Sequence, residues 1–295
     1  MNFTASTTPA DCPACHGTTQ RHDFNVCDYP LWRCTDCRME FLYPQPDEDE
    51  LATIYGRRYY DAWGLSVDET IVRKMKIFHF LKLLVKVQSD IPPEGRILDV
   101  GCATGYFLEA AREMGFEPFG IELSNYGAEI CRGKFGIGHI HEGSLETAVF
   151  KDSPVGCFDA IFMSDLLEHV RDPTATLQAA RRWLPPGGRL LITTPDVGSL
   201  SHRVFGRHWL HYKPEHLFYF GKNSLERLLA DAGFGATVFW ATPKYLSLRY
   251  ARHQFAAFRF AGGRLGQWFD KLPAGILDRK LRVKLGEVTV MATAI

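Results

Sequence analysis

The stretch Ile97-Leu98-Asp99-Val100-Gly101-Cys102-Ala103-Thr104-Gly105 decides the fold. An apolar run that contains an acidic residue breaks into a turn of small residues, and helical spacing of apolar residues resumes at Phe107. In parallel α/β sheets, a ligand lies over such a strand-turn-helix unit, because the backbone N–H groups of the turn and the helix N-terminus face it. The stretch therefore predicts an α/β fold with a cofactor over residues 101–105.

The spacing of small residues in this turn indicates the kind of cofactor. A dinucleotide fingerprint places glycines at the first, third and sixth positions, which here hold Gly101, Ala103 and Tyr106. The large Tyr106 argues against NAD, whereas small residues at 101, 103 and 105 still let a smaller ligand touch the backbone. Glu122 follows Gly101 by 21 residues and can accept hydrogen bonds from two ribose hydroxyls. We therefore expect an adenosine-containing ligand.

Strand-like and helix-like segments alternate outward from this turn, which is typical of parallel strands joined by crossover helices. Turn and capping residues mark three helices: one over 107–114, one from Pro173 to the residues before Pro185, and one over 225–232 that Asn223 and Glu226 open. Seven strands are predicted at 97–100, 119–122, 139–141, 160–163, 190–193, 236–241 and 287–294. We expect one seven-stranded Rossmann-like sheet with helices on both faces.

Composition limits the classes of function. The chain has 295 residues, 34 Lys and Arg against 34 Asp and Glu, and 46% hydrophobic residues, which is typical of a soluble globular protein. A formal net charge of zero argues against a protein that mainly grips nucleic acid or an anionic membrane. The longest apolar segment, 77–87, is short and carries charged residues, and the N-terminus lacks a basic start followed by an apolar run. These features predict a cytoplasmic protein.

Four of the eight cysteines form two close pairs. Cys12 and Cys15 make one C-x2-C turn, and Cys34 and Cys37 make another after 18 intervening residues. This spacing is typical of a tetrahedral zinc site, and so short a segment needs the metal to fold. We therefore predict a structural zinc ribbon over residues 1–45, with a redox pair as the alternative. Cys27, His16 and His22 lie between the pairs, and we leave them out of the predicted ligand set.

Composition also divides the rest of the chain. The acidic, proline-containing stretch 41–50 predicts an extended linker, and Ser66 with Glu69 predicts a capping box that opens a helix. The predicted division is a ribbon at 1–45, a linker and helical segment at 46–90, a cofactor-binding core at 91–242, a basic helical insert at 243–286, and the last core strand at 287–295.

The predicted insert is strongly basic. Between Tyr245 and Gly286, nine Lys and Arg face only two acidic residues, Asp270 and Asp278. Apolar residues at 248, 255 and 258 fall on one side of a helix. The segment predicts either an amphipathic lid that meets an anionic or lipid-linked acceptor at a membrane surface, or a solvated cap over the cleft.

From about residue 70 to 240 the sequence resembles the class I S-adenosylmethionine-dependent methyltransferases. The matching stretches are DVGCATG (99–105), the acid Glu122, CFDAIFMSDLLEHV (157–170) and LPPGGRLLITTP (184–195). The resemblance implies that Asp99 and the turn hold the methionine part of S-adenosylmethionine, that Glu122 binds the ribose and that the loop after the third strand borders the adenine. Ala103 replaces the usual middle glycine. The implied cofactor-binding residues are Asp99, Gly101, Ala103, Gly105, Glu122, Ser144, Leu145 and Ser164.

Methyl transfer from a sulfonium requires alignment of an acceptor atom and, for many acceptors, removal of its proton. Asp165, Glu168 and His169 follow the fourth strand at i, i+3 and i+4, which puts them on one face of a helix. They predict either a base or a divalent metal site. In ubiquinone-type O-methyltransferases, which this part resembles, a similar E-x-x-E-H stretch is associated with a divalent cation.

The stretch WLHYKPEHLFYF (209–220) resembles methyltransferases of deoxysugars, including sugar C-methyltransferases with an N-terminal zinc-binding lobe and a tyrosine-rich segment. There, a Glu-His pair serves in proton removal. The resemblance implies that Glu215 and His216 are the acid/base pair, assisted by His169 and Tyr59. The alternative is that the pair only caps a turn over the pocket.

The leading hypothesis is an S-adenosylmethionine-dependent methyltransferase with a small-molecule acceptor: a sugar, a lipid-linked compound or a secondary metabolite, methylated on carbon or oxygen. The alternative is an RNA-modifying enzyme that clamps nucleic acid with the ribbon and the basic insert. Against it, the fourth strand ends in Met-Ser-Asp-Leu, without the Asn/Asp-Pro-Pro-aromatic stretch of base-modifying enzymes. A purely binding domain is a third hypothesis, disfavoured by two His-acid pairs. The oligomeric state stays open.

Overall fold

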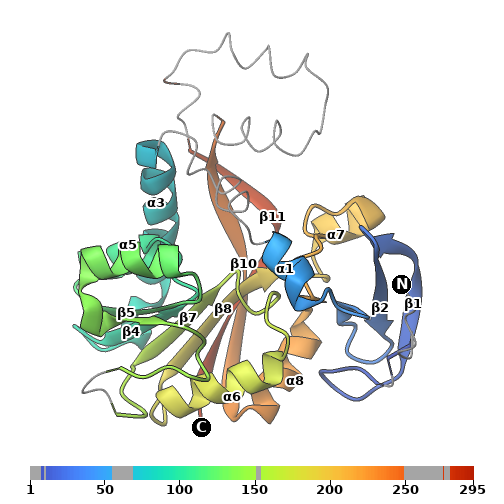
Figure 1. Ribbon diagram of the computed structural model, residues 1–295, viewed down its shortest axis with the longest axis horizontal. Coiled ribbons are helices and arrows are strands. Elements are labelled where there is room, and N and C mark those ends of the chain that lie inside the picture. Colours follow the sequence, from blue (N-terminus) through green and yellow to red (C-terminus); the bar gives the residue numbers. More distant parts are fainter. Residues whose placement is uncertain (1–7, 10, 55–68, 151–153, 249–274, 276–279) are drawn as a thin grey trace.

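The structure is a computed structural model that describes residues 8–9, 11–54, 69–150, 154–248, 275 and 280–295. A central mixed sheet has the strand order β10-β11-β8-β7-β4-β5-β6 (Figure 1). Only β11 runs antiparallel to its neighbours. All seven predicted strands are confirmed: β4 (Arg96–Val100), β5 (Glu117–Glu122), β6 (Ile140–Glu142), β7 (Ala160–Ser164), β8 (Arg189–Pro195), β10 (Phe234–Ser247) and β11 (Lys280–Ala294).

Alternating side chains bury both faces of this sheet. In β7, Ala160 and Phe162 pack with helices on one face, and Ile161 and Met163 pack in the core on the other. The first face carries α3 (Glu69–Val87), α4 (Tyr106–Glu113) and α5 (Asn125–Phe135), and the second carries α6 (Pro173–Trp183) and α8 (Lys222–Asp231). Helices on both faces are therefore confirmed. Within the described ranges, no helix has the length and apolar character needed to cross a bilayer.

Local capping sets the helix boundaries. The Asp172 side chain accepts a hydrogen bond from the Ala175 N–H at the start of α6, and Pro173 occupies the first turn, as the sequence predicts. The prediction that Asn223 caps α8, with the helix over 225–232, was wrong at its start. This helix begins at Lys222, three residues earlier than predicted, and the Ser224 hydroxyl accepts from the Gly221 N–H and caps the first turn.

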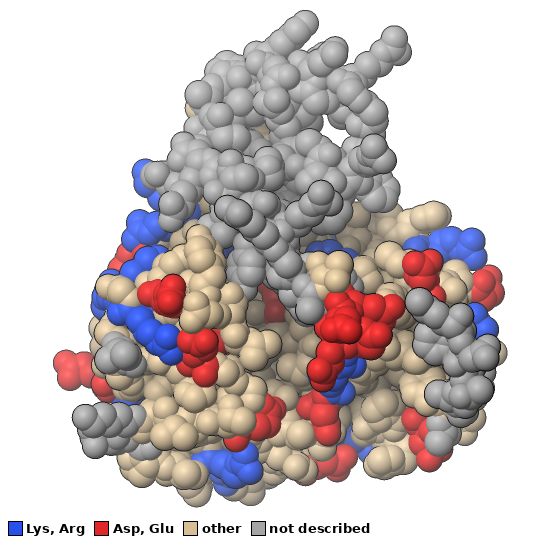
Figure 2. Space-filling view, viewed as in Figure 1, with Lys and Arg blue, Asp and Glu red and all other residues tan. Residues whose placement is uncertain are grey.

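The prediction of an extended linker over 41–50 was also wrong. The strand β3 (Glu40–Leu42) and the helix α1 (Glu48–Ile54) occupy half of it. The Asp47 and Glu50 side chains each accept a hydrogen bond from the other residue's backbone N–H at 2.8 Å, which is a capping box. Acidic residues in the first turn also suit the helix dipole. Figure 2 shows acidic side chains gathered on the surface over α1.

A second sheet has four strands in the order β1-β2-β3-β9 and forms the lobe beside α7 in Figure 1. Three strands come from the N-terminal part of the chain: β1 (Thr19–Val26), β2 (Tyr29–Cys34) and β3. The fourth, β9 (Phe218–Tyr219), comes from residues 196–221 between β8 and α8, which we call the β8–α8 segment. This segment also contains α7 (Leu200–Phe205) and the short helix η4 (Gly206–His208). The N-terminal lobe is therefore completed by the central domain.

The remaining short elements connect larger ones. They are the 3-10 helices η2 (Gln88–Asp90) and η3 (Ile137–His139). The strands β10 and β11 run further than predicted, since residues 244–247 pair with 280–283 inside the predicted basic insert. Positions 249–274 and 276–279 of that insert lie outside the described residues, so its predicted role as a lid stays a prediction.

We predict that Gly120→Ala lowers the free energy of unfolding by about 1–3 kcal/mol through overpacking. A Cβ at this position of β5 would lie 2.7 Å from the Cys102 Sγ and 3.1 Å from Ile140 and Leu108 carbons. Gly133→Ala in α5 is the matched control, because no atom lies within 4 Å of its Cβ position. This control raises the free energy of unfolding by about 1 kcal/mol through helix propensity. Urea unfolding followed by circular dichroism measures both; equal stability of the two variants would contradict the packing described here.

Candidate active site

The turn after β4 lies at the carboxyl edge of the sheet. Gly101, Ala103 and Gly105 have φ values of 80°, 48° and 86°, all in the left-handed region. The N–H groups of Gly101 and Cys102 both donate to the Ile121 carbonyl, at 2.8 and 3.0 Å, which ties the turn to β5. Ala103 holds its conformation at a cost of about 1 kcal/mol relative to glycine. Its Cβ is therefore tolerated where the related family usually has glycine.

Glu122 lies directly beside this turn, as its spacing predicts. Its carboxylate accepts from the Ala103 N–H and from the Ser124 N–H, each at 2.8 Å. Burial raises the pKa of Glu122, and the two backbone donors oppose this effect. Gly127, in α5, lets this helix pack closely against the turn, since a Cβ there would lie 2.8 Å from the Ala103 oxygen. Each carboxylate oxygen keeps a second lone pair with which to accept a ligand hydroxyl.

The other predicted cofactor-binding residues lie along the same edge. Asp99 is buried near the end of β4, and burial raises its pKa. Ser144 and Leu145 follow β6; the serine hydroxyl contacts Thr147, whereas the Leu145 side chain is buried in the hydrophobic core. Ser164 ends β7 and is half-buried. The structure thus brings the predicted set to one edge, and their roles in binding stay predictions.

Asp165, next to Ser164, belongs to a half-buried ion cluster that the sequence did not reveal. The Lys244 Nζ lies 2.9 Å from the Asp165 Oδ2 and 2.7 Å from the Glu287 Oε1. Burial opposes the Asp165 charge, but Lys244 outweighs it and lowers the carboxyl pKa; Asp165 and Glu287 likewise raise the pKa of Lys244. Burial raises the pKa of Glu287 to about 7. Asp165 has a φ of 53°, an unusual conformation for a residue with a Cβ.

Glu168, His169 and His216 form a second group near Asp165. One ligand atom of each lies within 4.8 Å of the others. The Glu168 Oε2 accepts from the Thr194 hydroxyl at 2.9 Å, and burial with the nearby Asp165 charge raises its pKa to about 8. The ring centroids of His169 and His216 are 4.7 Å apart. Asp165 does not join this group, because Lys244 binds it instead.

Backbone bonds hold the Glu215–His216 pair against this cluster. The Glu215 carbonyl accepts from the His169 Nδ1 at 3.0 Å, and the Leu217 N–H donates to the Glu168 carbonyl at 2.8 Å. A carbonyl can only accept, so the His169 Nδ1 carries the proton and the Nε2 remains the basic atom. Burial lowers the pKa of His169 to about 4. Tyr59, the fourth predicted catalytic residue, lies outside the described residues.

Burial also lowers the pKa of His216 well below its usual value, assisted by His169 and Lys213. The imidazole is therefore neutral at physiological pH. Within the described part of the chain, no hydrogen-bond partner reaches its buried Nδ1. His216 thus has the protonation state that a general base needs.

The four predicted zinc ligands converge in the N-terminal lobe. Their Sγ atoms all lie within 4.8 Å of one another, with separations of 3.6 Å between Cys12 and Cys37 and 3.4 Å between Cys15 and Cys34. A tetrahedral zinc site with Zn–S bonds of about 2.3 Å has sulfurs about 3.8 Å apart. The donor set therefore fits zinc.

The two cysteine turns also repeat the same hydrogen bonds. The Cys12 N–H donates to the Gly17 carbonyl at 3.0 Å, and the Cys34 N–H donates to the Met39 carbonyl at 2.9 Å. A backbone N–H two residues after each of these cysteines points at its Sγ at 3.4 Å. Such donors stabilise thiolates, which are the form that binds metal.

Sequence reasoning missed Lys244 and Glu287, although both lie at the candidate site. Lys244 follows the predicted strand 236–241 and was assigned to the basic insert, and Glu287 opened the last predicted strand. Their meeting with Asp165 depends on the pairing of β11 with both β8 and β10. In the sequence, these two residues are marked only as charged residues at the ends of predicted strands.

Comparisons with known proteins identify the family and the fold of this chain. The methyltransferase domain family matches residues 72–237. Ubiquinone biosynthesis O-methyltransferases of Xanthomonas axonopodis pv. citri and Xanthomonas oryzae pv. oryzae are 31% and 34% identical, each over 52% of this chain and 62% of the relative. This chain thus spans about three fifths of the length of these relatives.

A solved structure from Thermotoga maritima, described as a methyltransferase dependent on S-adenosylmethionine and a possible histamine N-methyltransferase, has the same fold. It is 20% identical, with a TM-score of 0.52, and the match covers 81% of this chain and 96% of that one. The matched family, the strand order and the turn beside Glu122 agree. The chain therefore belongs to the class I S-adenosylmethionine-dependent methyltransferases.

Proposed function

We propose that this protein transfers the methyl group of S-adenosylmethionine to a small-molecule acceptor, with His216 as the base that removes the acceptor proton. The observation that carries the proposal is the position of the Glu215–His216 pair against Glu168 and His169, which follow β7 next to the cofactor turn. The relatives named ubiquinone biosynthesis O-methyltransferase support an acceptor that is a metabolite.

The residues of the chain would divide the work as follows. The turn over 101–105 and Glu122 bind the cofactor, which supplies an electrophilic methyl group on its sulfonium when bound. Lys244 and Glu287 hold Asp165 in place at the end of β7. The neutral imidazole of His216 takes the proton from the methyl acceptor. His169 holds the Glu215 carbonyl in place through its Nδ1–H.

We favour proton transfer over a divalent cation held by the predicted set Asp165, Glu168 and His169. The predicted metal set begins with Asp165, and the Lys244 ammonium binds that carboxylate at 2.9 Å. Coordination by Asp165 would require this half-buried ion pair to break.

We further propose that Cys12, Cys15, Cys34 and Cys37 bind one structural zinc ion. We expect about one zinc per chain by plasma mass spectrometry. Cys34→Ser loses the metal and lowers the melting temperature, because metal binding contributes to the folding of this lobe. Cys27→Ser is the matched control, since Cys27 is exposed and outside the ligand group. Full zinc content in Cys34→Ser would exclude the site.

We predict that Glu122→Ala weakens S-adenosylmethionine binding about tenfold to hundredfold, because hydrogen bonds to a charged group are lost. Isothermal titration calorimetry measures the dissociation constant. Glu117→Ala, at the opposite end of β5, is the control and binds normally, since Glu117 pairs only with Arg96 at the surface. Unchanged affinity in Glu122→Ala would remove the ribose assignment.

One labelling experiment tests the function. Methyl-labelled S-adenosylmethionine is incubated with the protein and with extracts fractionated into nucleic acid, protein, lipid and small metabolites. We expect label in the metabolite or lipid fraction, and about a hundredfold lower rate with His216→Ala, whose cofactor affinity stays normal. Label in RNA would favour the RNA-modifying alternative, and full turnover by His216→Ala would eliminate it as the base.

A further inference from the structure

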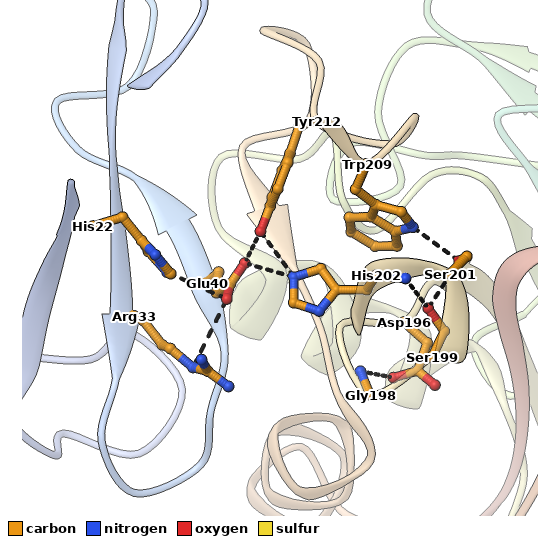
Figure 3. A network of polar contacts seen from close by, with 10 residues as sticks. All are labelled: His22, Arg33, Glu40, Asp196, Gly198, Ser199, Ser201, His202, Trp209 and Tyr212. Atoms are coloured by element: carbon orange, nitrogen blue, oxygen red, sulfur yellow. Dashed lines mark hydrogen bonds and ion pairs between the residues drawn. The ribbon is translucent and has the colours of Figure 1, made fainter. Parts of the chain in front are cut away.

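A buried carboxylate joins the N-terminal lobe to the β8–α8 segment. Glu40, in β3, is 0% exposed, and four side chains surround it (Figure 3). Tyr212 donates a hydrogen bond to the Oε2 at 2.6 Å, and the His202 Nε2 lies 3.5 Å from the same oxygen. The His22 Nε2 and the Arg33 Nε lie 3.3 and 3.8 Å from the Oε1. Each carboxylate oxygen therefore faces a different part of the protein.

The partners of Glu40 divide between the two parts. His22 and Arg33 belong to β1 and β2, whereas His202 and Tyr212 belong to the β8–α8 segment. Burial raises the Glu40 pKa, but His202, His22 and Tyr212 outweigh it and lower this pKa to about 2. The group is a carboxylate at neutral pH. A buried charge needs its partners in place, because removing one leaves it uncompensated.

Tyr212 comes immediately before the stretch that carries the proposed acid/base pair. The Lys213 carbonyl accepts from the Tyr219 hydroxyl at 3.0 Å and from the His216 N–H at 3.1 Å. The His202 Nε2 also lies 2.9 Å from the Tyr212 hydroxyl. A shift of Tyr212 would therefore move the Lys213 carbonyl and, with it, the backbone that orients the His216 ring.

We propose that Glu40 is a positioning residue for methyl transfer: it fixes Tyr212, and Tyr212 fixes the loop that presents Glu215 and His216. This inference rests on the proposed role of His216. The N-terminal lobe thus contributes to turnover through a buried carboxylate, apart from its metal-binding cysteines.

Glu40→Gln tests the proposal, because it keeps the shape and removes the charge. We expect the initial rate of label transfer to the metabolite extract, at saturating S-adenosylmethionine, to fall about tenfold as the loop is misplaced. The dissociation constant for S-adenosylmethionine stays within about twofold, since Glu40 lies outside the cofactor turn, and the zinc content is unchanged. Asp23→Asn is the matched control. It breaks the exposed Asp23–Arg207 pair, which bridges the same two parts, and leaves the rate unchanged.

Tyr212→Phe provides a second route if Glu40→Gln folds poorly, because it keeps the carboxylate together with Arg33 and the two histidines. We expect a similar loss of rate, and a double variant no slower than the slower single variant. Equal rates for Glu40→Gln and Asp23→Asn, or single effects that multiply in the double variant, would overturn the inference. If His216→Ala loses turnover while both of these variants keep it, only the inference fails; if His216→Ala keeps turnover, the proposed function fails first.

Discussion

The parallel pairing of β4 with β5 and β7 is the constraint on which the site depends. Because parallel strands present their carboxyl ends at one edge, the turn after β4 lies beside Glu122 at the end of β5 and Ser164 at the end of β7. The hydrogen bond from the Ala103 N–H to Glu122 then fixes the turn in a left-handed conformation that an alanine would otherwise avoid. No residue of this edge needs a long loop to reach its neighbours.

Charged residues that are far apart in the sequence meet at the same edge of the sheet. Lys244 is 79 residues from Asp165, and it reaches this carboxylate because β11 pairs antiparallel between β8 and β10. Burial and the surrounding cations and acids push the pKa values of Asp165 and Glu287 in opposite directions, down and up. Next to them, burial keeps His169 and His216 neutral. Separated protonation states of this kind are what acid/base chemistry at neutral pH requires.

Residues close in sequence were predicted well, and distant pairings were not. The spacing of Gly101 and Glu122 and the spacing of the two cysteine pairs are local patterns, and the structure brings both sets together. The stretch 41–50 misled because its prolines outweighed Asp47 and Glu50, whose spacing is itself a capping signal. A two-residue strand such as β9 has no periodicity to detect. Glu40 drew no attention because its partners come from β1, β2, α7 and the loop that carries Tyr212.

The pairing of β9 with β3 has a consequence for the order in which the protein is made. The four cysteines lie within 26 residues of one another, so a metal site can close soon after this part of the chain emerges from the ribosome. The outer edge of β3 has no strand partner until residues 218 and 219 have been synthesised. Until then the N-terminal lobe exposes Phe41 and the unpaired backbone groups of an edge strand to other chains. Nascent chains therefore carry an unpaired sheet edge until β9 has been synthesised and can pair with β3.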